Sequence, residues 1–267
     1  MSMATAQRAG CRLRYEIDGN PAGPPVLFSN SLGTTCEMWK PQLDALSSRF
    51  QIIRYDTRGH GASEVPPGPY TLETLALDAL AILEATDVDR AHVCGLSLGG
   101  LTAMWLAVHR PDRVRSVTLA STAARIGNAK MWDERIVLVR TSGVHSLVDA
   151  AMGRWFSQSF RASDPDVVAI YNRMLSATPP EGYAACCAAI RDVDLRPAIN
   201  RISIPALIIA GHHDPVTPPA DAEDMRSRIP NSRVSLLDAA HILNVEQARA
   251  FNDVLGTFIT EQEASHG

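Results

Sequence analysis

The segment Gly95-Leu96-Ser97-Leu98-Gly99 places one serine in a turn between two glycines. A short β-type run ending at Cys94 precedes it, and an apolar helical run from Leu101 to Val108 follows it. A strand, a sharp turn and a helix in this order strain the central residue, so its neighbours must be small. The strain exposes the hydroxyl group at the N-terminus of the helix. The pattern predicts that Ser97 is a nucleophile on a strand-turn-helix elbow.

β-type segments alternate with helical ones along most of the 267 residues. This alternation predicts an α/β fold with a mostly parallel central sheet and helices on both faces. The helix after the elbow should end near Arg110, because cationic side chains and Pro111 follow its apolar run. The predicted strands are residues 13–17, 26–28, 51–55, 91–94, 114–119, 206–210 and 234–237.

Only helical patterns are found between the two groups of predicted strands. We therefore divide the chain into a first core part of residues 1–121, a helical cap of residues 122–197 and a second core part of residues 198–267. Ligands of open parallel sheets bind beyond the carboxyl ends of the strands, so the cap is expected to cover Ser97. A helical layer without a role in binding is the alternative.

An activated serine needs a base, and the base needs an acid that orients it. On an elbow of this kind the acid and then the histidine follow the serine along the chain. Asp214 and His241 each follow one of the last two predicted strands. We expect His241 to accept the proton of Ser97 and Asp214 to hold its imidazole. Asp238 is the rival acid, three residues before His241.

Two backbone N–H groups are expected to bind the oxyanion that forms when the serine attacks a carbonyl carbon. Leu98 directly follows the nucleophile, and Leu32 lies in the loop after an early predicted strand. We therefore expect the N–H groups of Leu98 and Leu32 to form the oxyanion hole. A tight turn is sufficient to explain why position 33, next to Leu32, is a glycine.

Other interpretations of these segments are weaker. Cys94 is a rival nucleophile, but a thiol in a buried strand usually belongs to the core. The run His212-His213-Asp214 could bind a metal, yet adjacent histidines point in different directions and no second ligand cluster is apparent, so no metal or other cofactor is expected. Cys186 and Cys187 are adjacent in a predicted helix, and we expect buried, reduced thiols.

The charge pattern excludes several classes of partner. The net charge is -4 without a strong run of either sign, so no nucleic-acid surface and no membrane-binding face is indicated. Residues 1–10 lack the continuous apolar segment of a signal peptide, so we expect a cytoplasmic location. No pattern indicates the oligomeric state.

Five motifs together resemble the 3-oxoadipate enol-lactonases, a group of α/β-hydrolases, and the resemblance extends from about Tyr15 to Val254. The D-x-R-G-H-G-x-S part is shared by many hydrolases and implies the fold, whereas the combination is much narrower. Many relatives carry His-Gly where this chain and the lactonases carry Asn30-Ser31. The motifs are S-N-S-L-G-T-T at 29–35, R-Y-D-T-R-G-H-G-A-S at 54–63, P-P-G-P-Y at 66–70, G-L-S-L-G-G at 95–100 and G-H-H-D-P-V-T-P-P at 211–219.

The resemblance implies hydrolysis of the enol-lactone of 3-oxoadipate through an acyl-enzyme on Ser97, in the β-ketoadipate pathway of aromatic-compound breakdown. This small-molecule lactone carries a free carboxylate, so its pocket should present a cation in an apolar cavity. Trp132 and Arg135 lie three residues apart on one predicted helix, and Arg154-Trp155 repeats the pairing. We expect Arg135 to bind the carboxylate and Trp132 and Trp155 to contact the substrate. Solvated arginines and core aromatics are the alternative.

Other activities stay open at this point. A general carboxylesterase or a carbon-carbon bond hydrolase on the same fold would use the same three residues, and a ligand receptor could retain them. Ser97 at the elbow disfavours the dehalogenases and epoxide hydrolases that use an aspartate there.

Overall fold

Eight strands of residues 4–265, the part described by this computed structural model, form one sheet in the order β1-β2-β4-β3-β5-β6-β7-β8. β1 and β2 run antiparallel to their neighbours, and the remaining strands are parallel. The predicted α/β fold class is confirmed. The strands are β1 (Ala4–Arg8), β2 (Cys11–Gly19), β3 (Pro25–Ser29), β4 (Gln51–Tyr55), β5 (Ala91–Leu96), β6 (Val114–Ala120), β7 (Ala206–Gly211) and β8 (Ser232–Leu237).

Burial along the strands follows their place in the sheet. Every residue of β5 and β7 is buried, because helices cover both faces of central parallel strands. β8 lies at an edge, and of its residues only Leu237 is buried. β4 has the predicted bounds, and the other predicted strands are longer by one or two residues at one end or at both ends.

β1 is a strand that the sequence did not predict. Only Ala6 of its residues is buried, so β1 lacks the apolar alternation that identifies a strand. Antiparallel pairing with β2 holds it in place across a two-residue turn. Ala9 and Gly10 in this turn have positive φ angles of 47° and 72°, as tight hairpin turns require.

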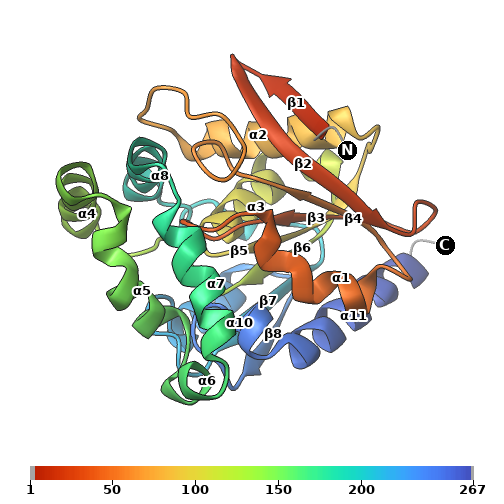
Figure 1. Cartoon of the computed structure of the whole chain (residues 1–267). Helices are drawn as coiled ribbons and strands as arrows, with labels where there is room; N and C mark the ends of the chain where they lie inside the picture. Colours follow the sequence, from red (N-terminus) through yellow and green to blue (C-terminus); the bar gives the residue numbers. More distant parts are fainter. Residues whose placement is uncertain (1–3, 266–267) are drawn as a thin grey trace.

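Helices cover both faces of the sheet (Figure 1). α2 and α3 pack together on one face, and α1 and α11 pack together on the other. The α-helices are α1 (Lys40–Leu46), α2 (Leu72–Ala85), α3 (Leu98–His109), α4 (Ala129–Ser142), α5 (Val148–Trp155), α6 (Gln158–Ser163), α7 (Pro165–Ser176), α8 (Pro180–Asp192), α9 (Pro219–Arg228), α10 (Leu243–Glu246) and α11 (Ala248–Ala264). Short 3-10 helices are η1 (Cys36–Trp39), η2 (Pro111–Arg113), η3 (Val144–Leu147) and η4 (Ile199–Arg201).

Between β6 and β7 the chain leaves the sheet and forms the helices α4 to α8. We call this stretch, residues 129–192, the helical segment. α4 packs against α8 and α5 against α7, and all four lie together at the left of Figure 1. The helical segment falls within the predicted cap of residues 122–197, and the division of the chain into 1–121, 122–197 and 198–267 stays a prediction.

The loop after β4 connects the core with the helical segment. Arg58 in this loop donates to Asp78 of α2 at 2.6 Å, and their side chains are only 6% and 1% exposed. The Arg58 carbonyl accepts from the thiol of Cys186 in α8. A Cβ atom on Gly182 of α8 would lie 2.2 Å from the carbonyl oxygen of Gly59, so glycine is required for this approach of two backbones.

The buried pair of Arg58 and Asp78 should dominate the stability of this connection. Asp78→Asn should lower the free energy of unfolding by about 3 to 5 kcal/mol, because a buried guanidinium loses its counter-charge. Asp112→Asn removes the carboxylate of an exposed pair with Arg110 and should cost less than about 1 kcal/mol. Urea denaturation of both variants beside the parent protein measures the difference, and equal losses would contradict it.

Candidate functional site

Ser97 occupies the turn between β5 and α3 with φ 57° and ψ -111°, a left-handed conformation that is strained for serine. Its backbone is fixed on both sides. The N–H group of Ser97 donates to Ala120 at 3.0 Å, and the carbonyl oxygen accepts from the Thr122 hydroxyl at 2.9 Å and from the N–H group of Leu101 at 3.0 Å. The predicted strand-turn-helix elbow is therefore present.

The glycines around Ser97 are required by contact. A Cβ atom on Gly95 would lie 2.0 Å from the carbonyl oxygen of Gly99. A Cβ atom on Gly99 would lie 2.0 Å from the carbonyl oxygen of Ser29, at the end of β3. The start of α3 therefore packs directly against the loop that follows β3, and this loop contains Leu32.

Asp214 and His241 are brought together from the loops after β7 and β8. His241 Nδ1 lies 2.8 Å from Asp214 Oδ2, and both residues are buried. Thr217 donates to Asp214 through its hydroxyl at 2.7 Å and its N–H group at 3.1 Å, and the N–H group of Val216 donates at 2.8 Å. Burial opposes ionisation, but the charge of His241 and these hydrogen bonds outweigh it and lower the pKa of Asp214.

The rival acid, Asp238, lies at the surface with a different partner. Its carboxylate is 2.8 Å from Nε2 of His213, and the two side chains are 82% and 60% exposed. His213 and Asp214 are adjacent in sequence but contact different groups. Asp238 therefore cannot orient His241 in this conformation.

Ser97 and His241 line one cavity of ≈150 Å³ together with residues of the helical segment. The Ser97 hydroxyl forms no hydrogen bond with any group of residues 4–265. The Ser97 hydroxyl and the His241 imidazole can come within hydrogen-bond distance when a substrate binds, because such contacts often tighten only in the complex.

Two backbone N–H groups beside Ser97 are left without acceptors. Leu32 and Leu98 are both buried, and within the described part of the chain neither N–H group has a hydrogen-bond partner. The neighbours of Leu32 are satisfied, because the N–H of Ser31 contacts the Met38 sulfur and that of Gly33 donates to His60. Buried backbone donors without partners are rare, so these two are available to an oxyanion.

His60 is a functional candidate that the sequence analysis missed. Its Nε2 accepts from the N–H group of Gly33 at 3.0 Å, and its Nδ1 lies 3.3 Å from the carbonyl oxygen of Arg58. Burial lowers the pKa of His60 to about 4, although Arg58 and Asp56 favour the cation. The neutral imidazole therefore holds the loop that carries Leu32. The sequence did contain a signal for His60, the His-Gly pair at 60–61, but the motif that contains this pair was interpreted only as evidence of the fold.

The predicted substrate contacts line the same cavity. Trp132 and Arg135 of α4 and Trp155 of α5 all border it. Trp132 is fixed by a 2.8 Å hydrogen bond from its Nε1 to the carbonyl oxygen of Ile126, and the Arg135 guanidinium lies 4.9 Å from the centre of its ring. Arg154, which precedes Trp155, lines the cavity as well.

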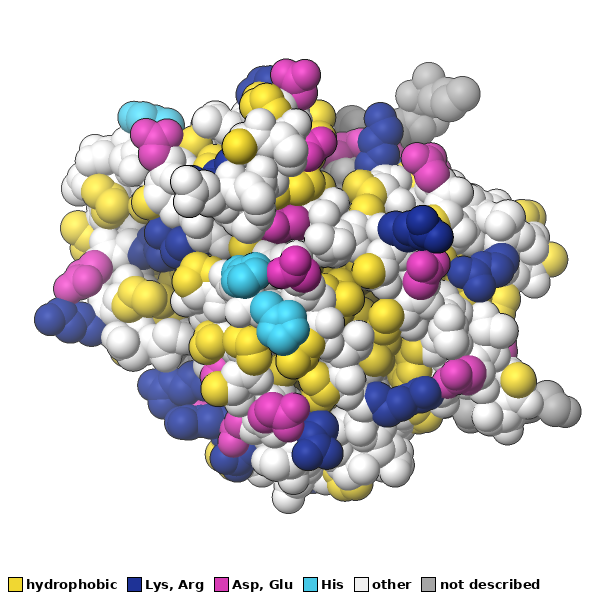
Figure 2. Space-filling model, turned by 90° about the horizontal axis from the view of Figure 1, so that it is seen from below, with side chains coloured by type: hydrophobic (Ala, Val, Ile, Leu, Met, Phe, Trp, Pro, Cys, Tyr) yellow, Lys and Arg dark blue, Asp and Glu magenta, His cyan; other side chains and the backbone are white. Residues whose placement is uncertain are grey.

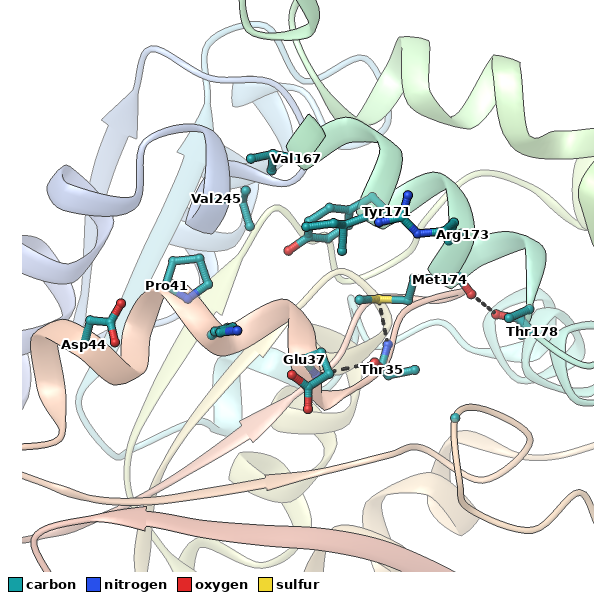
Figure 3. A pocket seen from close by; sticks show the side chains of 14 residues that line it. Thr35, Glu37, Pro41, Asp44, Val167, Tyr171, Arg173, Met174, Thr178 and Val245 are labelled. Atoms are coloured by element: carbon teal, nitrogen blue, oxygen red, sulfur yellow. Dashed lines mark hydrogen bonds between the residues drawn. The ribbon is translucent and has the colours of Figure 1, made fainter. Parts of the chain in front are cut away.

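A larger cavity of ≈760 Å³ lies elsewhere, between α7 and the η1–α1 region (Figure 3). Tyr171 and Met174 line one wall, and Thr35 and Pro41 line the other. Ser97, Asp214 and His241 do not border this cavity. The smaller cavity is therefore the one that the predicted catalytic residues Ser97 and His241 border.

The rival nucleophile and the possible metal ligands have structural explanations. Cys94 is buried in β5, and burial raises the pKa of its thiol. Glu16, Cys36 and Glu37 are close enough to share a metal ion, but Arg14 contacts all three of them. An ion-pair network accounts for this group without a metal. All five cysteines are free and buried, as expected.

The surface shows no concentration of one charge on the face seen in Figure 2, where acidic and basic side chains are interspersed with apolar ones. None of the helices within residues 4–265 combines the length and apolar character needed to cross a bilayer.

Comparison with known proteins agrees with the fold. A family model described as the alpha/beta hydrolase fold matches residues 24–248. The chain is 44% identical over 240 residues to 3-oxoadipate enol-lactonase 2 of Acinetobacter baylyi, with 90% of each chain covered. It is 40% identical over 258 residues to 3-oxoadipate enol-lactonase 1 of the same organism, with 97% of each covered. The crystal structure of the enol-lactonase from Burkholderia xenovorans LB400 matches with a TM-score of 0.95 and 44% identity, covering 96% of this chain and 100% of that one. The chain therefore belongs to the α/β-hydrolase family, as its motifs predicted.

Proposed function

We propose that this protein is a serine hydrolase that opens the enol-lactone of 3-oxoadipate to 3-oxoadipate, in the breakdown of aromatic compounds. The supporting observation is that Ser97, Leu32 and His241 line one cavity. Asp214 holds the buried imidazole of His241, and Leu98 directly follows Ser97. The identity of 40% and 44% to enol-lactonases supports the choice of substrate.

In the first half of the reaction, Oγ of Ser97 attacks the carbonyl carbon of the lactone while Nε2 of His241 accepts its proton. Asp214 at Nδ1 selects the tautomer in which Nε2 is free to accept, and it stabilises the imidazolium that forms. The N–H groups of Leu32 and Leu98 bind the oxyanion. Collapse of the tetrahedral intermediate breaks the ring C–O bond, and the enol oxygen receives the proton from His241 while it stays tethered to the acyl chain.

In the second half, water attacks the acyl carbon, and His241 accepts a proton from it. The bond between the acyl group and Ser97 breaks, the proton returns to Ser97, and the carboxylate is released. The enol then becomes the ketone. Conjugation in the enol makes it a good leaving group. The transition state for ring opening therefore needs less stabilisation by the protein than that of a saturated lactone.

The carboxylate of the lactone is assigned to Arg135. Its guanidinium borders the cavity beside Trp132, and Trp155 lies on α5 at the same cavity. The indole rings provide apolar walls for the ring of the substrate, and the guanidinium provides a charge-assisted hydrogen bond. Selectivity for a lactone with a carboxylate would follow from this combination.

Ser97→Ala should lower kcat for the enol-lactone by about four to six orders of magnitude and leave the melting temperature near that of the parent protein. Cys94→Ala is the matched control and should keep most of the activity. Loss of lactone absorbance measures both. Faster turnover of p-nitrophenyl acetate than of the enol-lactone by the parent protein would favour a general carboxylesterase, and micromolar binding with turnover near once per hour would favour a receptor.

Asp214→Asn should lower kcat by about three to four orders of magnitude, because His241 loses the group that selects its tautomer. Asp238→Asn should change kcat by less than about threefold, because this exposed carboxylate pairs with His213. Steady-state kinetics of the two variants compare the acids directly. A larger loss in the Asp238 variant would reassign the acid.

His60→Leu should lower kcat about tenfold to a hundredfold with little change in KM, because the loop carrying Leu32 loses its acceptor and the oxyanion donor moves. His60→Gln keeps an oxygen that can accept from Gly33, so it should recover part of the activity. A purely structural role would lower the melting temperature of both variants and leave kcat of the folded fraction unchanged.

A further inference from the structure

Two arginines of the helical segment face the cavity that contains Ser97. Arg135 of α4 and Arg154 of α5 both line it, and both are partly buried. The two charges influence each other, because the charge of Arg135 helps to lower the pKa of Arg154, after the larger effect of burial. No carboxylate of residues 4–265 lies within 4 Å of either guanidinium.

The two fully buried arginines within residues 4–265 are paired. Arg58 binds Asp78, and Arg54 binds Asp18 at 2.9 Å. The chain carries 29 acidic residues against 25 basic ones, so the lack of a carboxylate partner for these arginines is not a consequence of too few carboxylates. Taking a cation out of water without a counter-charge is unfavourable, and placing two such cations near each other adds repulsion. An anionic ligand between them would remove both costs.

We propose that Arg154 binds the same ligand carboxylate as Arg135 and is thereby a specificity-determining residue of the cavity. The inference rests on the proposed function in that the carboxylate of the lactone is the group assigned to this position. The cavity measures ≈150 Å³, so a small ligand that reaches Ser97 lies close to both α4 and α5. Each guanidinium can supply charge-assisted hydrogen bonds to a carboxylate oxygen.

Neutral ligands are rejected by the same arrangement. A neutral ester or lactone of similar size displaces water from the two guanidinium groups but has no negative charge to interact with them. Sites built for a polar group discriminate strongly against analogues that lack it, because the groups of the site are then left unpaired. The two arginines therefore select for an acid at the end of the cavity formed by α4 and α5.

The test uses adipate, which has two carboxylates and no bond to hydrolyse, with isothermal titration calorimetry as the readout. Arg154→Met and Arg135→Met should each weaken adipate binding at least about tenfold. The double variant should lose less than the product of the two single losses, because both arginines act on one carboxylate. Arg140→Met is the matched control on α4, since Arg140 pairs with the exposed Glu181, and it should change Kd less than about twofold.

Thermal unfolding separates binding from a structural role. Without ligand, Arg154→Met should unfold at the parent temperature or above it, because an unpaired cation is removed, and saturating adipate should raise its melting temperature less than that of the parent. A lower melting temperature in the free protein would indicate a structural role and overturn the inference.

Three further outcomes have definite meanings. An Arg154→Met variant that binds adipate as the parent does, a parent that does not bind adipate, or independent losses in the double variant would each overturn the inference. Adipate binding that depends on both arginines, in a protein that does not hydrolyse the enol-lactone, would support this inference and contradict the proposed function.

Discussion

The close approach of Gly99 to Ser29 is the constraint on which the site depends. Because Gly99 has no Cβ atom, the start of α3 packs directly against the carbonyl group of Ser29, where the loop after β3 begins. This contact brings the segment that carries Leu98 and the segment that carries Leu32 to the same place. The position of the two candidate oxyanion donors beside the strained turn at Ser97 therefore depends on one backbone contact, and a methyl group at position 99 would separate them.

The site is also defined by which polar groups are left without partners. Ser31, Gly33 and Asp214 are all hydrogen-bonded, so the framework is rigid. The hydroxyl of Ser97, the N–H groups of Leu32 and Leu98 and the guanidinium of Arg154 have no acceptor or counter-charge within residues 4–265. Unsatisfied groups lower stability wherever they occur in a fold. Ser97, Leu32 and Arg154 line one cavity, and Leu98 directly follows Ser97, which is the pattern expected of a functional site.

Local patterns were sufficient to predict much of this molecule. The run from Gly95 to Gly99 can form only a few kinds of turn, so the elbow was accessible from sequence. β7, a buried parallel strand, is a continuous apolar run. β1 was missed because it is held by pairing with β2 rather than by its own burial. The bond from Gly33 to His60 and the convergence of Arg135 with Arg154 depend on tertiary packing between distant segments, and no spacing in the chain encodes them.

The central claim is that the oxygen of Ser97 becomes covalently attached to the acyl group of the lactone. Rapid acid quenching during turnover, followed by mass spectrometry of the peptide that contains residue 97, tests this directly. The account predicts that this peptide gains the mass of one intact lactone, because ring opening leaves every atom of the substrate on the enzyme. An adduct on another residue such as Cys94, with none on the peptide that contains residue 97, would contradict it.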